Sequence, residues 1–346
     1  MVVGRQAGRA YIGSFTAAGG LGVLTAAVDT GTGALAVLST TDAVPDPSYL
    51  ALSPSGDTLY AVSETSDGAV AAFHIDGDKP ELRGKPVPVG SAPTHLDLYD
   101  GHVLTANYRS GSVTAVPLRD DGGLAATPSS ELRHTGSGPH PQRQQGPHAH
   151  QVLADPSGRW AVSVDLGTDS VRVCAFGDDG LTLHREVAVR PGSGPRHLAF
   201  HPDGDRAYLL NELSPTLTTC SWDAGTGALK PLSEVSVLVD TPEGDVYPSA
   251  VVVAPDGRFL WTATRGTDVI SVLALGAPDE APRLAATVPC GGHWPRDLAL
   301  HPSGRHLYAA NERSGDVTWF TVDPGTGIPR KAGSIDAPAA SCVIFG

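Results

Sequence analysis

The chain has 346 residues, is rich in glycine (41) and proline (29), and has a formal net charge of −13 at pH 7. This acidic balance argues against a nucleic-acid backbone as the partner, because such a partner requires a basic surface. No apolar run is long enough to span a membrane, and the N-terminal residues lack the apolar core of a secretory signal, so we expect a cytoplasmic protein that does not bind membranes.

Predicted β-strands begin close to the N-terminus and then fall into a repeat. The first three are the segments AYIGSF, GVLTAAVD and ALAVLST. Six units follow, starting near residues 49, 95, 150, 197, 249 and 297, and each has an apolar run, a tight turn and a second apolar run. The turn glycines are Gly56, Gly101, Gly158, Gly204, Gly257 and Gly304. Their spacing of about 45 to 57 residues is typical of one propeller blade per repeat.

A last predicted strand, SCVIFG, ends the chain. Each of the six units accounts for four strands, so the three N-terminal strands and this one form a seventh blade. Joining both ends of the chain in one blade closes the ring and removes an exposed sheet edge. We predict an all-β fold with one domain over residues 1–346, a seven-bladed β-propeller with four antiparallel strands per blade.

One segment interrupts the repeat. Residues 129–151, SSELRHTGSGPHPQRQQGPHAHQ, are polar and show no strand period. A long loop in a compact fold usually has a function, and this one ends directly before a first strand, beside the predicted central channel. We expect it to be a loop over the channel mouth.

Four charged or titratable residues lie where first strands begin or second strands end: His148, Arg196, Glu212 and Arg265. First and second strands run antiparallel, so these positions share one end of the ring and should converge on one channel mouth. The same rule adds His150, Glu64, Asn107, Asp165, Arg296 and Asn311 as candidate substrate-binding residues. The alternative for each is a turn residue that binds backbone groups, or an Arg196–Glu212 pair that only supports the fold.

Neither a metal nor an organic cofactor is expected. His148, His150 and Glu212 could gather around zinc, but a His-x-His spacing alone is weak evidence. The four cysteines are Cys174, Cys220, Cys290 and Cys342; they are far apart and show no metal-type pairing, so we expect reduced, buried thiols.

The chain resembles the seven-bladed propeller lactonase family, which includes propeller-type 6-phosphogluconolactonases and fungal carboxymuconate-lactonising enzymes. The resemblance rests on GPHAHQ, VDLGTDSV, GPRHLAFHPDG, LLNE and TRGTDVISV. It implies an active site made of His148, Arg196, Glu212 and Arg265, with no metal. The sequence departs from the family pattern in GGHWPRDLALHP and AANERSGDV and in the insertion Pro139–Gln145, and these departures bear on substrate identity.

These residue types suit ring-opening of a lactone. Glu212 or His148 could act as the base, while Arg196 and Arg265 offer donors to a carboxylate, a phosphate or a developing oxyanion. We expect a lactonase for a small anionic sugar-acid lactone, with 6-phosphogluconolactone as a candidate. The same groups could close a ring, so an intramolecular cyclase or cycloisomerase acting on another carboxylated substrate is one alternative. A non-catalytic binding scaffold is the other.

Overall fold

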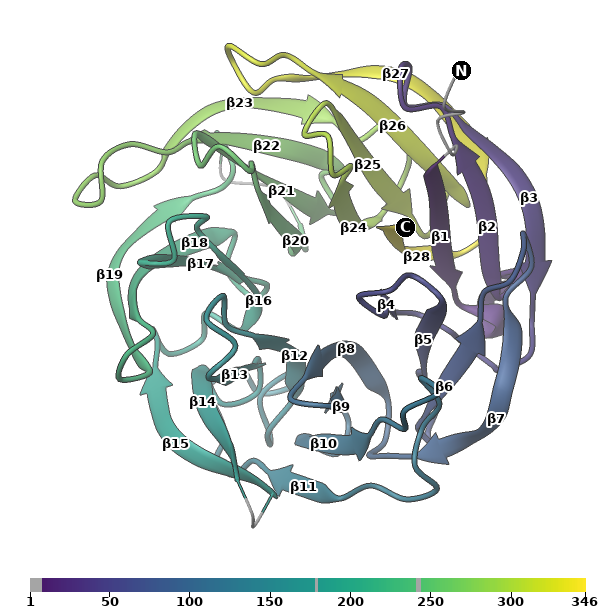
Figure 1. Cartoon of the computed structure of the whole chain (residues 1–346). Helices are drawn as coiled ribbons and strands as arrows, with labels where there is room; N and C mark the ends of the chain where they lie inside the picture. The colour runs from purple at the N-terminus through teal and green to yellow at the C-terminus, as the bar shows by residue number, and fades with distance from the viewer. Residues whose placement is uncertain (1–7, 178–179, 241–243) are drawn as a thin grey trace.

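The computed structural model of the chain describes residues 8–177, 180–240 and 244–346 and shows seven four-stranded antiparallel sheets around a central axis (Figure 1). The segment that lacks a secretory signal falls largely on residues 1–7, outside the described residues. The predicted all-β, seven-bladed propeller is therefore confirmed. In the described part of the chain, no helix has the length and hydrophobicity needed to cross a membrane.

Six blades consist of four consecutive strands, with the first strand nearest the axis and the fourth at the rim (Figure 1). The first three are β4 (Leu50–Leu52), β5 (Thr58–Ser63), β6 (Ala69–His74), β7 (Glu81–Pro88); β8 (Pro93–Tyr99), β9 (His102–Asn107), β10 (Ser112–Pro117), β11 (Ser130–Arg133); and β12 (Ala149–Ala154), β13 (Ala161–Asp165), β14 (Ser170–Gly177), β15 (Gly180–Ala188). The other three are β16 (Pro195–Phe200), β17 (Arg206–Asn211), β18 (Thr216–Asp223), β19 (Ala228–Ser236); β20 (Tyr247–Val253), β21 (Phe259–Arg265), β22 (Val269–Ala274), β23 (Arg283–Pro289); and β24 (Pro295–Leu300), β25 (His306–Asn311), β26 (Asp316–Val322), β27 (Pro329–Asp336).

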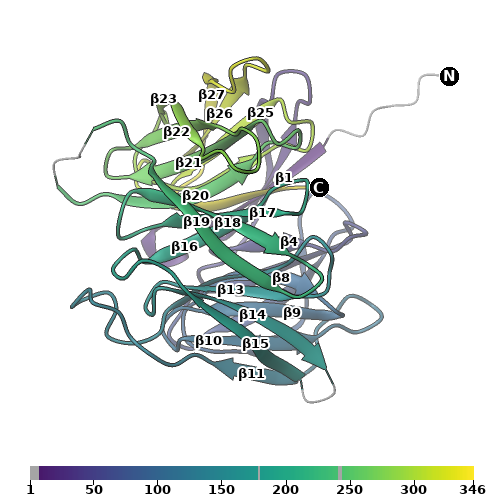
Figure 2. The same ribbon diagram turned by 90° about the vertical axis from the view of Figure 1, so that its left-hand side faces the viewer.

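The seventh blade joins both ends of the chain, as predicted. Strand β28 (Ala340–Phe345) lies nearest the axis and is followed outward by β1 (Gly8–Ser14), β2 (Val23–Val28) and β3 (Leu35–Thr41), with one 3-10 turn, η1 (Thr16–Ala18), after β1. Ala10 lies opposite Phe345 and Ile12 opposite Val343 in an antiparallel ladder. Figure 2 shows the ring edge-on, with the C-terminus on one face beside the start of β1.

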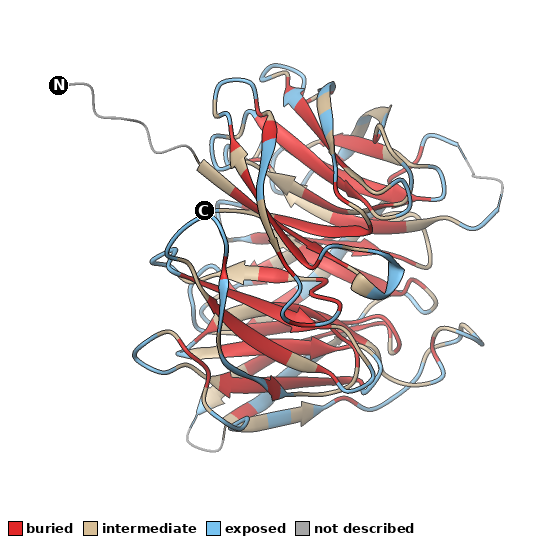
Figure 3. Ribbon diagram, turned by 90° about the vertical axis from the view of Figure 1, so that its right-hand side faces the viewer, coloured by how far each residue is buried: buried red, intermediate tan, exposed pale blue. Residues whose placement is uncertain are grey.

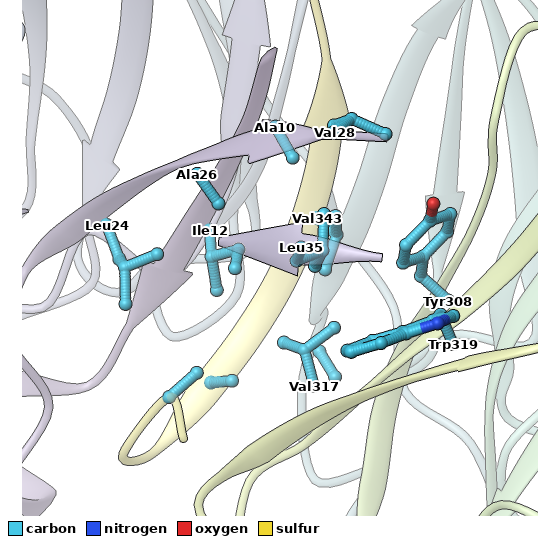
Figure 4. Close-up of a cluster of buried hydrophobic side chains, with 13 residues drawn as sticks. Ala10, Ile12, Leu24, Ala26, Val28, Leu35, Tyr308, Val317, Trp319 and Val343 are labelled. Atoms are coloured by element: carbon cyan, nitrogen blue, oxygen red, sulfur yellow. The ribbon is translucent and has the colours of Figure 1, made fainter. Parts of the chain in front are cut away.

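Burial is highest in the second strands of the blades and lowest at the rim. All residues of β13 are buried, whereas the rim strand β27 is mostly exposed (Figure 3). The apolar clusters lie between neighbouring blades: one joins Ile12 and Val343 of the closing blade to Tyr308 and Trp319 of the blade β24–β27 (Figure 4). Face-to-face packing of sheets is thus what stabilises the ring.

The structure corrects one expectation about the segment 129–151. Its first residues form β11, the rim strand of the blade β8–β11, with Ser112 opposite Arg133 and Ala115 opposite Ser130. A rim strand needs backbone partners but little apolar surface, and the side chains of β11 are half-buried or exposed. The segment SELR therefore has no apolar alternation to reveal it.

The four cysteines are buried and free, as the sequence predicted. Each is held in a strand or directly after one, at positions 174, 220, 290 and 342. Burial raises the pKa of the Cys174 thiol to about 12, so this thiol stays protonated and unreactive.

The closing blade gives a first prediction. Val343 is 3% exposed in the apolar cluster of Figure 4, while Val37, in β3 of the same blade, is 51% exposed. Replacing Val343 by alanine removes two buried methyl groups and should lower the free energy of unfolding by about 2 kcal/mol. Val37→Ala is the control and should change it little. Urea unfolding measures both; equal effects would show that β28 contributes no special packing.

Candidate active site at the channel mouth

β-Bulges in the first strands determine which side chains face the axis. In six first strands the register skips one residue: Thr94, His150, Arg196, Ser249, Arg296 and Ser341. A β-bulge redirects the side chain at the extra residue. Thr94, Arg196, Arg296 and Ser341 line one small cavity together with Ser48, so the bulges turn these side chains toward the axis. The cavity has room for about one water molecule.

Three acidic residues lie where second strands end at the same mouth: Glu64 follows β5, Glu212 follows β17 and Glu312 follows β25. Glu212 and Glu312 each follow an asparagine, Asn211 and Asn311. Successive residues of an extended chain point to opposite sides, so each asparagine turns into its blade and the glutamate turns to the mouth.

Two candidate binding residues, Asn107 and Asn311, form hydrogen bonds within their own blades. Asn107 donates to the hydroxyls of Ser112 (3.1 Å) and Thr114 (2.9 Å), and Asn311 donates to the hydroxyl of Thr318 (2.7 Å). Both side chains are fully buried. We therefore assign them to holding second and third strands together, not to binding substrate.

Asp165, at the end of β13, is also fully buried. Its Oδ1 accepts from the backbone N–H of His148 (2.9 Å) and of Thr168 (3.0 Å), and its Oδ2 contacts His134 Nδ1 (2.6 Å) and Arg172 Nη1 (3.1 Å). Its carboxylate fixes the backbone before β12. It supports the mouth from beneath and does not line it.

Glu212 is the centre of the mouth. Its Oε2 lies 3.0 Å from Arg196 Nε and 2.8 Å from Arg265 Nη2. Its Oε1 accepts a hydrogen bond from Arg143 Nη2, which belongs to the loop after β11. The predicted convergence of Arg196, Glu212 and Arg265 is thus observed. Arg143 was missed because a loop position follows no repeat.

The charges of this cluster do not cancel. Burial alone would raise the pKa of Glu212, but the charges of Arg265, Arg196 and Arg143 outweigh burial and lower it to about 2. Burial, reinforced by the charge of Arg265, lowers the pKa of Arg196 to about 9. Three guanidinium groups around one carboxylate leave a net positive site, which favours an anionic ligand.

His148 lies beside this cluster with one ring nitrogen committed. Its Nδ1 is 2.9 Å from the backbone carbonyl oxygen of Tyr108, which can only accept, so Nδ1 bears a proton. In the neutral imidazole the lone pair is then on Nε2, which has no hydrogen-bond partner among the residues that the structure describes. Its ring stacks on the Tyr108 ring at 4.4 Å and 14°. Arg143 donates to the Tyr108 hydroxyl (3.2 Å), which connects His148 to the Glu212 cluster.

A glycine makes this placement possible. A Cβ at Gly167 would lie 2.0 Å from the carbonyl oxygen of Gly146 and 2.9 Å from Cδ2 of His148. Any side chain there would displace the loop that holds the histidine. The glycine of the VDLGTDSV motif is therefore a positioning residue for His148.

A second charged group lies across the mouth. Arg296 Nη1 is 3.2 Å from Glu312 Oε2, and Arg296 Nη2 is 3.6 Å from Glu64 Oε1. Glu64 also accepts from the Ser48 hydroxyl (2.5 Å). Burial raises the pKa of Glu64 against the opposing charge of Arg296. Arg296 and Glu312 pair at the same strand positions as Arg196 and Glu212, two blades further along the chain. The Asn-Glu sequence that both blades share could have revealed Glu312.

Beneath the arginines lies a layer of buried histidines. The ring of His197 contacts the rings of His95 (5.5 Å between centroids) and His150 (5.2 Å) edge-on. Burial, with the charge of Arg196, lowers the pKa of His95 to about 3 and holds those of His150 and His197 well below the ordinary value. His150 is thus a neutral group inside the channel, next to the mouth and not on its rim.

Metal-ligand geometry occurs elsewhere. Among the residues that the structure describes, one group of three could hold an ion: His201, Asp203 and Asp205. These residues lie at the turn between β16 and β17, on the face opposite the mouth. They do not belong to the candidate site.

The chain is similar to several known proteins. The sequence model described as "Lactonase, 7-bladed beta-propeller" matches residues 9–345. The chain is 34% identical over 341 residues to the 6-phosphogluconolactonase of Bacillus subtilis (strain 168), with 97% of each protein covered. A solved protein from Lactobacillus plantarum superposes with a TM-score of 0.92 at 29% identity, covering 99% of this chain and 100% of that one. The periplasmic gluconolactonase of Pseudomonas aeruginosa gives 0.91 at 28%, covering 98% and 99%.

Proposed function

This chain belongs to the seven-bladed β-propeller lactonase family, and we propose that it hydrolyses a phosphorylated sugar-acid lactone, 6-phosphogluconolactone, at the mouth formed by His148, Arg196, Glu212 and Arg265. The observation that supports this most is the pairing of a histidine whose Nε2 is free with a buried arginine cluster of net positive charge. The first can activate water, and the second can stabilise negative charge.

His148 is the base in this proposal. Its Nε2 takes a proton from water as the water oxygen bonds to the lactone carbonyl carbon. The carbonyl oxygen then bears the negative charge beside the guanidinium groups. When the ring C–O bond breaks, Nε2–H returns its proton to the leaving ring oxygen, which gives the open hydroxy acid. Atoms and charges balance without another reactant.

Glu212 has a different task. A carboxylate whose pKa is near 2 is a weak base at neutral pH. It stays ionised and holds Arg196 and Arg265 in fixed positions, so that their remaining N–H groups face the substrate. We therefore propose Glu212 as a positioning residue and the two arginines as the groups that bind the substrate anion or the oxyanion.

The proposal is tested by following acid release in a pH-stat with 6-phosphogluconolactone and with unphosphorylated gluconolactone. Spontaneous hydrolysis in a protein-free blank is subtracted. The expected result is saturable hydrolysis, with the higher kcat/KM for the phosphorylated lactone. Rates equal to the blank for both lactones would overturn the proposal.

Metal removal gives a further prediction. Hydrolysis should be unchanged after dialysis against EDTA, because a net positive arginine cluster repels a cation and His148 Nδ1 is already bonded to a carbonyl. Rates before and after dialysis, with and without added zinc, measure this. Activity that is lost with EDTA and restored by zinc would make His148 a ligand and not a base.

A further inference from the structure

One rim position is occupied by an unexpectedly large residue. Two residues before each of Ser48, Thr94, Arg196, Arg296 and Ser341, the backbone turns into the left-handed region. The residues there are Asp46, Ala92, Gly194, Trp294 and Ala339, with φ of 45°, 50°, 58°, 66° and 51°. Four of these are small or short and polar. A tryptophan in this conformation costs about 1–3 kcal/mol, and such strain is typical of functional sites.

Trp294 is held firmly in place despite this cost. Its N–H donates to Asp268 Oδ1 (2.8 Å), and its carbonyl oxygen accepts from the N–H of Glu312 (3.1 Å). Its indole contacts two arginines: the guanidinium carbon of Arg265 is 5.6 Å from the ring centre and that of Arg313 is 3.4 Å. The indole therefore fixes Arg313 next to the Glu212 cluster.

Arg313 differs from the other arginines of the mouth in its partners. Arg143, Arg196 and Arg265 pair with Glu212, and Arg296 pairs with Glu64 and Glu312. Among the described residues, Arg313 has no acidic partner within ion-pair distance, and its side chain is exposed. A guanidinium that is stacked, accessible and uncompensated is arranged for an anion from solution.

We propose that Arg313, stacked on Trp294, binds the phosphate of the lactone whose carbonyl lies at the Arg265–Glu212 cluster. This inference rests on the proposed function. Arg265 and Arg313 both lie over one indole, so their guanidinium carbons are no further apart than the sum of their two distances to its centre. This span suits a sugar ring with a substituent. The fork of donors on a guanidinium matches a phosphate. Arg313 is thus the residue that distinguishes phosphorylated from unphosphorylated substrate.

The test is a specificity ratio, kcat/KM for 6-phosphogluconolactone divided by kcat/KM for gluconolactone. Arg313→Ala should lower this ratio by about 10- to 100-fold, the usual loss for hydrogen bonds to a charged group, mainly through KM. Trp294→Gly should also lower it while leaving the protein folded, because glycine suits the φ of 66°. Arg330→Ala, an exposed arginine on the rim strand β27, removes the same charge far from the mouth and should leave the ratio unchanged.

An unchanged ratio in Arg313→Ala, or an equal loss with both lactones, overturns the inference while the proposed function stands. If the wild type hydrolyses neither lactone, the proposed function fails and binding decides the inference. Calorimetry then compares 6-phosphogluconate with gluconate. A preference for the phosphorylated acid that is lost in Arg313→Ala supports the inference, and no preference in the wild type refutes it.

Discussion

His148→Ala is expected to lower kcat for lactone hydrolysis by about 10²- to 10⁴-fold, the range for removing a general base. The reason is the single free lone pair on Nε2, fixed by the bond from Nδ1 to the Tyr108 carbonyl. Glu212 is less suited to this role, because a carboxylate whose pKa is about 2 is a weak base at neutral pH. Initial rates over a range of lactone concentrations separate kcat from KM.

His184→Ala serves as the control, because His184 lies on the exposed strand β15, where it packs on Trp160 far from the mouth. It should retain wild-type kcat. Added imidazole should restore part of the activity of His148→Ala by supplying the missing base. If His148→Ala retains full kcat while Glu212→Gln abolishes it, Glu212 is the base and the assignment is reversed.

Glu212→Gln is expected to destabilise the folded protein by about 3–5 kcal/mol, the loss typical of breaking a buried ion pair. The neutral amide leaves three guanidinium groups facing one another, and Arg196 and Arg265 are 3% and 8% exposed. Urea unfolding at pH 7 measures this. Glu312→Gln is the matched control: Glu312 is 22% exposed and contacts only Arg296 among the described arginines, so about 1 kcal/mol or less is expected. Equal losses in the two variants would contradict the central role of Glu212.

The same carboxylate gives stability a pH dependence. The folded-state pKa of Glu212, about 2, lies below the ordinary value of 4.5. Its contribution is therefore fully present above pH 4.5 and is lost as the pH falls toward 2. Unfolding experiments between these limits should show a loss of stability in the wild type that is smaller in Glu212→Gln.

The fold was predictable from sequence because the inner strands of each blade are buried on both faces. Runs such as HLAFH and AYLLN therefore show in the sequence as apolar segments around a glycine turn. The rim strand β11 was missed for the opposite reason, since its four residues need little apolar surface. The number of blades and the ring closure are predicted from the apolar inner strands. The missed rim strand therefore did not change the predicted seven-bladed fold.

The site was predictable only as far as the repeat reaches. The positions at strand ends correctly brought Arg196, Glu212 and Arg265 together. The rule does not give side-chain direction, which is why Asn107 and Asn311 were included although they point into their blades. Arg143 could not be found, because a loop's path over the mouth depends on tertiary contacts that the repeat does not encode.

The closing blade also sets the order in which this protein can be completed during synthesis. Among the described strands, β1 to β3 are made first, but the inner partner of β1 is β28, which is made after all the others. Until then the ladder edge from Ala10 to Ser14 has no partner and can pair with other chains. Contacts that span nearly the whole sequence also close slowly. Nascent chains are thus most prone to aggregation until β28 has been made, and a chain that lacks β28 would retain that exposed edge permanently.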